Sequence, residues 1–115
     1  PAGPFYNYDQ DGVEASAPVI DNWWRQGMTG GAKAHYDGIV AFSQTDFREE
    51  MKGITIPMLV LHGEHDQVVP FEISGKKSAE ILPNATLISY PGFSHGMPTT
   101  EAATINKDLL AFLRR

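Results

Sequence analysis

The sequence predicts an α/β fold built on a parallel sheet, and two observations carry this prediction. Residues 58–61 form a short, continuous apolar run, which is typical of a parallel strand buried on both faces. From that run to the end of the chain, strand-like and helix-like patterns alternate, as they do in parallel α/β sheets. With 115 residues, of which 42% are apolar and 20% charged, the chain is one globular domain at most, or part of one.

The first half of the chain has helical patterning. Residues 1–12 carry two prolines, two glycines and three aromatics, which predicts an ordered loop. Beyond this loop, apolar residues recur at helical spacing, with a glycine-containing break at 27–31. Asp46 could cap a further short helix, and Gly53 would end it. The predicted helices span residues 13–26, 32–42 and 47–52.

The second half of the chain predicts strand, helix, strand and helix. Gly75 falls inside the first of these helices, and Thr99 or Thr100 is placed to cap the last one. The predicted elements are a strand over 58–61, a helix over 71–82, a strand over 85–90 and a helix with an apolar stripe over 102–113. A two-stranded parallel sheet has two open edges and cannot bury strands this apolar. We therefore expect the neighbouring strands to come from another polypeptide or from sequence outside these 115 residues.

Composition excludes several classes of function. A net charge of −5 provides no basic patch for nucleic acid or for an anionic membrane. The absence of cysteine excludes disulfides and thiolate metal sites. No apolar run approaches the roughly 20 residues that span a bilayer, and no signal peptide pattern is visible. We therefore expect a cytoplasmic protein.

Polar residues follow both predicted strands where the strands end. Asp66 comes a few residues after the first strand, and His95 a few residues after the second. Active sites of open parallel sheets lie beyond the carboxyl ends of the strands. If the two strands are neighbours, the loops that carry Asp66 and His95 are adjacent there. An Asp that contacts a His is the orienting half of a catalytic triad, and the order acid then histidine fits hydrolases of this type. Both residues equally fit ordinary turns.

Two other functions stay open at this point. The cluster His62, Glu64, His65, Asp66 and His95 could bind a metal, and a metal-dependent hydrolase would use its three histidines. We favour no metal, because metal-binding histidine pairs are usually spaced i, i+4 on a helix. In that case His62 is a hydrogen-bonded structural histidine and His65 a solvated one. The chain could also be a non-catalytic α/β binding or dimerisation module.

Several segments resemble the α/β-hydrolases, and more narrowly the cofactor-free bacterial haloperoxidases, arylesterases and perhydrolases. The segment at 61–72, Leu-His-Gly-Glu-His-Asp-Gln-Val-Val-Pro-Phe-Glu, is similar to the acid loop of that family. Residues 90–97, Tyr-Pro-Gly-Phe-Ser-His-Gly-Met, are similar to its histidine loop. Residues 22–27 and 41–47 resemble the end of its helical cap, and 109–113 its last helix. The resemblance covers nearly the whole chain.

This resemblance implies a C-terminal part of the α/β-hydrolase fold, whose sheet would be completed by a missing N-terminal portion. Residues 1–53 would be the end of the helical cap, and residues 54–115 the βαβα part of the core. The parent enzyme would transfer acyl groups from small esters, with hydrogen peroxide as an alternative acceptor to water, and without a cofactor. It could also be a homo-oligomer.

The resemblance also assigns residue roles. Asp66 would be the triad acid and His95 the general base. Phe42, Val68 and Val69 would line an apolar acyl pocket, although ordinary core packing is the alternative for them. No Gly-x-Ser-x-Gly occurs in the sequence, so the nucleophilic serine and the oxyanion donors would come from the N-terminal portion. We expect the chain alone to be inactive.

Overall fold

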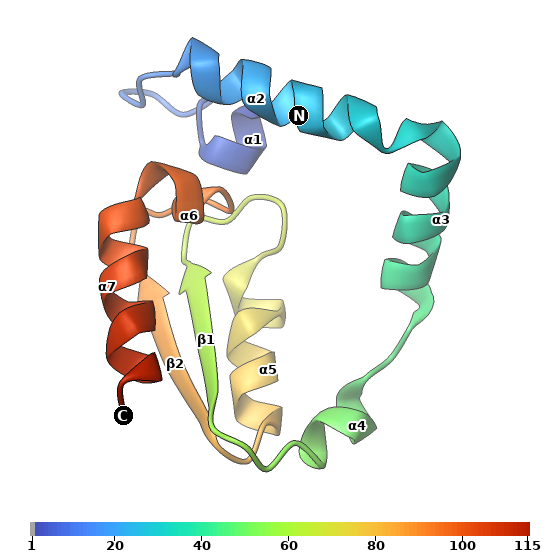
Figure 1. The fold of residues 1–115 in the computed structure, drawn as a ribbon, viewed down its shortest axis with the longest axis vertical. Helices are drawn as coiled ribbons and strands as arrows, with labels where there is room; N and C mark the ends of the chain where they lie inside the picture. The colour runs from blue at the N-terminus through green and yellow to red at the C-terminus, as the bar shows by residue number, and fades with distance from the viewer. Residues whose placement is uncertain (1) are drawn as a thin grey trace.

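The computed structural model describes residues 2–115 and shows a row of helices followed by a small parallel sheet (Figure 1). The N-terminal helices are α1 (Ala2–Tyr6), α2 (Ala17–Thr29), α3 (Gly31–Gln44) and α4 (Arg48–Lys52). The remaining elements are β1 (Met58–Gly63), the 3₁₀ turn η1 (Phe71–Ile73), α5 (Gly75–Ile81), β2 (Ala85–Tyr90), α6 (Met97–Thr100) and α7 (Ala102–Leu113). The predicted α/β class and the two predicted strands are confirmed.

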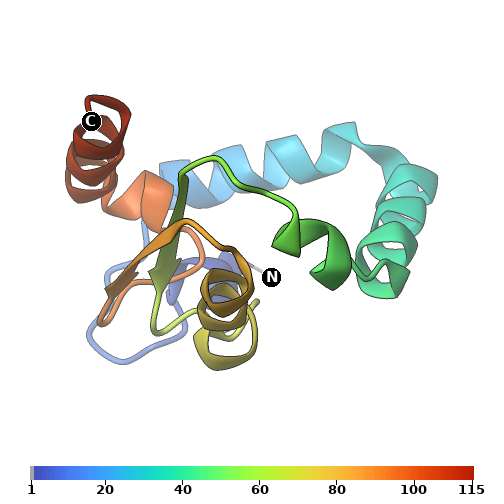
Figure 2. The ribbon, with the colours of Figure 1, turned by 90° about the horizontal axis from the view of Figure 1, so that it is seen from below.

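The two strands form a parallel pair with their carboxyl ends side by side. The register runs from Met58 opposite Ala85 to Gly63 opposite Tyr90. Figure 2 shows α5 and α7 on opposite faces of this pair. A small core lies on the α7 side, where apolar side chains from β2, α6 and α7 meet; its buried members are Tyr90, Met97 and Ile105. The strand ends from which the two loops begin are therefore packed against this core.

The N-terminal boundaries differ from the predicted ones in two places. Residues 2–6, predicted as loop, form α1. The helix predicted over 13–26 begins at Ala17 instead, because Pro18 lies in its first turn, where a proline costs no hydrogen bond. The same helix continues through the predicted break to Thr29. Phe47, and not the predicted Asp46, occupies the cap position of α4, although the Asp46 Oδ1 accepts the Arg48 N–H at 3.0 Å. The Arg48 side chain lowers the pKa of Asp46 to about 2.

The C-terminal half also departs from the prediction in two places. The helix predicted over 71–82 is divided at Ser74, which has a non-helical backbone and donates its hydroxyl to the Pro70 carbonyl at 2.6 Å. The last helix has no side-chain cap from Thr99 or Thr100, so that prediction is wrong. Both threonines belong to α6, and Glu101 occupies the cap position of α7.

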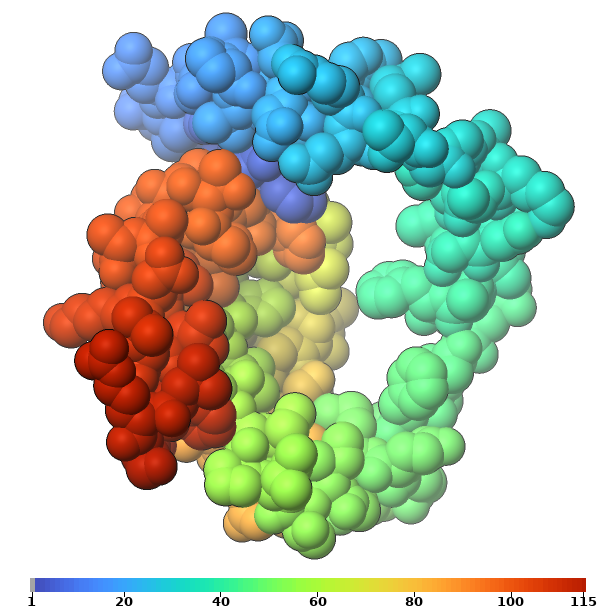
Figure 3. All heavy atoms as spheres, in the orientation of Figure 1, coloured from blue at the N-terminus to red at the C-terminus, as the bar shows by residue number. Residues whose placement is uncertain are grey.

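The apolar faces of the chain are largely uncovered. Among residues 2–115, neither α2 nor α3 buries a single residue, and Phe42 on α3 is 75% exposed. The Cα radius of gyration is 15.7 Å, whereas a compact domain of this length would have about 13 Å. Figure 3 shows an opening between α3 and the half that carries the strands. No other element among residues 2–115 therefore covers the outer edges of the strand pair or buries a residue of α2 or α3.

No helix in the described part of the chain is long and apolar enough to cross a membrane. The division of the chain at residues 53 and 54 falls directly after α4, and the assignment of the first part as a cap stays a prediction.

Candidate active site

Asp66 is held in a tight turn directly after β1. Its backbone N–H donates to the Gly63 carbonyl at 3.2 Å. Its Oδ1 accepts two backbone N–H bonds, from Val68 at 2.9 Å and from Val69 at 2.8 Å. The side chain is only 4% exposed. A carboxylate with two backbone donors on one oxygen has a fixed direction, and its other oxygen, Oδ2, is left for a partner.

That partner is His95, in the loop after β2. His95 Nδ1 donates to Asp66 Oδ2 at 2.7 Å. Gly63 makes this approach possible, since a Cβ there would lie 2.3 Å from the carbonyl oxygen of Phe93. Backbone hydrogen bonds join the two loops; in one of them the His65 N–H donates to the Phe93 carbonyl at 3.1 Å. The structure thus brings the predicted pair into direct contact.

The contact sets the chemistry of the imidazole. A carboxylate that accepts from Nδ1 fixes the proton there and leaves the lone pair on Nε2, which is the arrangement of a general base. The carboxylate also stabilises the imidazolium that forms when Nε2 takes a proton. The His95 side chain is 33% exposed, so it can be reached, whereas the carboxylate behind it is buried.

A cavity of about 520 Å³ lies against His95, between α1, α2 and the histidine loop. The Phe5 ring lies edge-on to the His95 ring, with the ring centroids 4.8 Å apart. Phe5 also packs against the Trp23 ring, with the centroids 5.9 Å apart. The Gly96 N–H donates to the Phe5 carbonyl at 2.7 Å, which fixes α1 over the histidine loop. Sequence analysis did not identify Phe5 as a site residue. The one available signal was the density of aromatic residues in the first segment.

The residues predicted for the acyl pocket lie elsewhere in the described chain. Phe42 projects from α3 with 75% exposure, and Val68 is 48% exposed. Neither they nor Val69 are among the residues that line the cavity against His95. What Val68 and Val69 contribute here is their backbone N–H groups, which bind Asp66. The role of these three side chains in a pocket stays a prediction.

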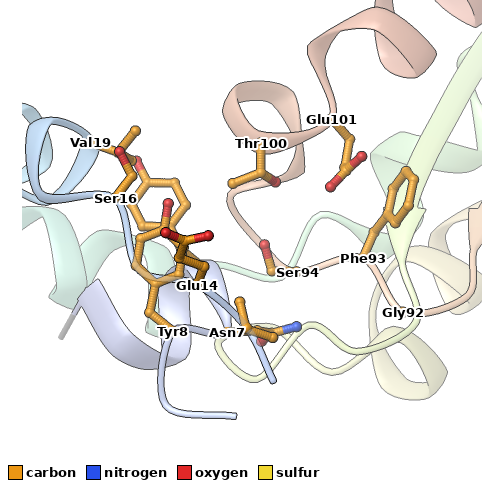
Figure 4. Close-up of a pocket in the computed structure, with 12 residues that line it drawn as sticks. Asn7, Tyr8, Glu14, Ser16, Val19, Gly92, Phe93, Ser94, Thr100 and Glu101 are labelled. Carbon is orange, nitrogen blue, oxygen red and sulfur yellow. The ribbon is translucent and has the colours of Figure 1, made fainter. Parts of the chain in front are cut away.

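A second cavity, of about 420 Å³, lies on another side of the histidine loop (Figure 4). Figure 4 shows the Ser94 hydroxyl pointing into it from the loop, with Glu14 and Tyr8 on the opposite wall. Ser94 Oγ is buried and has no hydrogen-bond partner among the described residues. An activated serine needs a base within hydrogen-bond reach, and Ser94 has none although it precedes His95. Ser94 is therefore not arranged as a nucleophile.

The other polar residues near the site have structural partners. Glu64 accepts a bond from Ser89 Oγ at 2.6 Å, and His65 is exposed. Tyr90 donates its hydroxyl to Asp108 at 2.7 Å, and burial together with this carboxylate raises the pKa of Tyr90 to about 12. The residues from 2 to 115 contain no group of three or more His, Cys, Asp or Glu side chains placed to hold a metal ion. The metal-dependent alternative thus lacks a ligand set in this part of the chain.

Comparison with known proteins places the chain in a family. Residues 33–115 match the profile of an α/β-hydrolase family described as TAP-like protein. The chain is 75% identical over 114 residues to a bifunctional esterase/perhydrolase of Acinetobacter calcoaceticus and 57% identical over 114 residues to a non-heme chloroperoxidase of Burkholderia pyrrocinia. Each alignment covers 99% of this chain and 41% of the relative.

Solved structures agree with these sequence comparisons. The crystal structure of a bromoperoxidase from Bacillus anthracis superposes with a TM-score of 0.83 at 37% identity, covering 98% of this chain and 41% of that one. An esterase from Exiguobacterium antarcticum, at 21% identity and a TM-score of 0.75, shares the fold. The chain spans about 41% of the length of its curated relatives. Through its match to the TAP-like family the chain belongs to the α/β-hydrolases, the superfamily that the resemblance of its acid and histidine loops predicted.

Proposed function

We propose that this chain supplies the acid and the general base of a serine hydrolase triad that acts on small esters. The observation that carries the proposal is the 2.7 Å bond between His95 Nδ1 and an Asp66 carboxylate that two backbone N–H groups hold in place. The neighbouring cavity is lined largely by aromatic and small side chains, which suits a small apolar acyl or alcohol group. The activities named for the similar proteins support the same class of reaction.

The reaction would run through an acyl-enzyme. A serine outside these residues attacks the ester carbonyl while His95 Nε2 takes its proton, and Asp66 stabilises the resulting imidazolium. His95 then returns the proton to the alcohol that leaves. In the second half, the water oxygen attacks the acyl carbonyl while His95 takes a proton from it. His95 then returns that proton to the serine Oγ as the acyl–oxygen bond breaks, which releases the carboxylic acid and regenerates the serine. If hydrogen peroxide takes the place of water, the same steps release a peracid, which can oxidise halide.

The nucleophile would come from an N-terminal portion that carries Gly-x-Ser-x-Gly and completes the sheet. The free outer edges of the strand pair and the exposed faces of α2 and α3 support this part of the proposal. Burying an exposed large apolar side chain such as Phe42 is worth about 1.5–3 kcal/mol. Several such side chains would therefore hold the two portions together. A folded, monomeric and cooperatively melting 115-residue chain would overturn this requirement.

The function is tested in a chimera in which this chain replaces the matching 41% of the Acinetobacter relative. We expect the chimera to hydrolyse nitrophenyl acetate and the isolated chain to show no activity above background. His95→Ala in the chimera should lower kcat by at least about 10³-fold, since the members of a triad act as a unit. His35→Ala, at an exposed position on α3, is the matched control and should leave kcat unchanged. Unchanged activity in His95→Ala would support a non-catalytic role instead.

A further inference from the structure

Asp66 lies next to a second histidine that the proposed mechanism does not use. His62, near the end of β1, places Nε2 at 2.9 Å from the carbonyl oxygen of Val69 and at 3.4 Å from Asp66 Oδ2. A carbonyl oxygen can only accept, so Nε2 carries the ring proton and donates it to Val69. The His62 side chain is only 12% exposed, so water competes little for this bond.

The bond from His62 fixes the turn that holds Asp66. On one side of the turn, the backbone N–H groups of Val68 and Val69 bind Asp66 Oδ1. On the other side, His62 holds the carbonyl of the same Val69 against β1. The segment from 66 to 69 is therefore tied at its far end to a strand that is itself paired with β2. Without the tie, Val69 could move, and Asp66 would turn with it.

The imidazole of His62 has little room to move. A Cβ on Gly75, the first residue of α5, would lie 2.3 Å from Nδ1 and 2.9 Å from Cγ of His62. The Phe71 ring packs against the same imidazole with centroids 5.5 Å apart. The ring is thus enclosed between η1, the start of α5 and the acid turn. Because the His62 ring is held rigidly, its hydrogen bond to Val69 can keep the turn at 66–69 in one position.

We propose that His62 is a positioning residue of the triad, which fixes the direction of Asp66 toward His95 through Val69. The inference rests on the proposed roles of Asp66 and His95. His62 does not line the cavity of about 520 Å³ against His95, although it borders a smaller space of about 180 Å³ together with Asp66 and His95. Because His62 acts through the turn that holds Asp66, its effect should appear mainly in the chemical step, that is in kcat.

The test compares two variants of the chimera. His62→Leu removes the donor and keeps a similar apolar volume, whereas His62→Gln keeps an N–H near the position of Nε2. We expect His62→Leu to lower kcat by about tenfold to a hundredfold with KM nearly unchanged, because small displacements of a triad member are costly. His62→Gln should recover most of kcat. His65→Leu, the same change at an exposed position of the same loop, should have no effect.

Two kinetic results obtained with His62→Leu would overturn the proposal. The first is a His62→Leu variant with kcat within about twofold of the parent chimera, given the tenfold loss expected. The second is a His62→Gln variant as impaired as His62→Leu, which would mean that ring packing and not the donor matters. If His62→Leu does not fold, His62→Asn takes its place, since its shorter amide is polar but falls short of Val69. Equal kcat in His62→Asn and His62→Gln would then overturn the proposal.

A proton NMR measurement separates this inference from the proposed function. The Nδ1 proton of His95, held by a carboxylate, should give a far-downfield resonance, assigned by its loss in His95→Ala. We expect this resonance in the parent chimera and in His62→Gln, and its broadening by exchange with water in His62→Leu. An unchanged resonance in His62→Leu would overturn the positioning role. A resonance that behaves as expected in a chimera without ester hydrolysis would overturn the proposed function, and only the structural effect of His62 on the contact between Asp66 and His95 would remain.

Discussion

Replacing Asp66 by Asn should reverse the hydrogen-bond direction at His95 without disturbing the turn. Two backbone N–H groups, from Val68 at 2.9 Å and Val69 at 2.8 Å, point at Oδ1, so the amide must keep its oxygen there. Its NH₂ group then faces His95 Nδ1, where Oδ2 now lies at 2.7 Å. Since the amide donates, Nδ1 must accept and the ring proton moves to Nε2. The imidazole then has no lone pair with which to take the proton of a serine.

The expected loss in kcat of the chimera is on the order of 10⁴-fold, as for the same reversal in a known serine protease triad. At 1.36 kcal/mol per factor of ten, the barrier rises by about 5.4 kcal/mol. KM should change little, and the melting temperature should stay within about 3 °C because both bonds to the turn are kept. The assay is nitrophenyl acetate hydrolysis together with a thermal melt, and Asp11→Asn is the control, with the same charge change at an exposed position. A folded Asp66→Asn variant that retains more than about one tenth of kcat would refute the reasoning about the tautomer.

Two further predictions concern stability. Tyr90 has a pKa raised to about 12 by burial and by Asp108, so its stabilising contribution is complete below pH 10 and is lost as the pH rises towards 12. Between about pH 9 and pH 11, the free energy of unfolding measured in urea should fall by about 1 kcal/mol more in the parent chimera than in Tyr90→Phe. An equal fall in both proteins would contradict the raised pKa of Tyr90. Gly63→Ala should destabilise by about 1–3 kcal/mol and lower kcat at least about tenfold, because its Cβ would meet the Phe93 carbonyl at 2.3 Å. Gly38→Ala, where nothing lies within 4 Å, should instead stabilise α3 by roughly 0.5–1 kcal/mol, and similar effects of the two substitutions would refute the clash.

The part of the fold that could be predicted depends on local patterns. The apolar run at 58–61 and the strand at 85–90 have turn residues at their ends, and the rule that parallel strands present their loops at one edge then places Asp66 near His95. The structure shows that contact at 2.7 Å. The catalytic roles of the two residues stay predictions, because they require a serine that these residues do not include.

The part that could not be predicted depends on contacts between distant segments. Phe5 lies against His95 because α1 folds back over the histidine loop, and no local pattern in the first twelve residues records that contact. The helix divides at Ser74, next to the point where Gly75 approaches His62, and the spacing of apolar residues reveals neither feature. Phe42 is exposed on α3, so its role depends on what covers that face.

In the proposed mechanism, His95 activates a serine that lies outside this chain. A fluorophosphonate reacts with activated serines, so mass spectrometry of the labelled chimera identifies the residue directly. We expect one label per molecule, on the serine of Gly-x-Ser-x-Gly in the N-terminal portion, and loss of labelling in His95→Ala. A label on Ser94 or on another serine of this chain, or labelling that persists without His95, would contradict this mechanism.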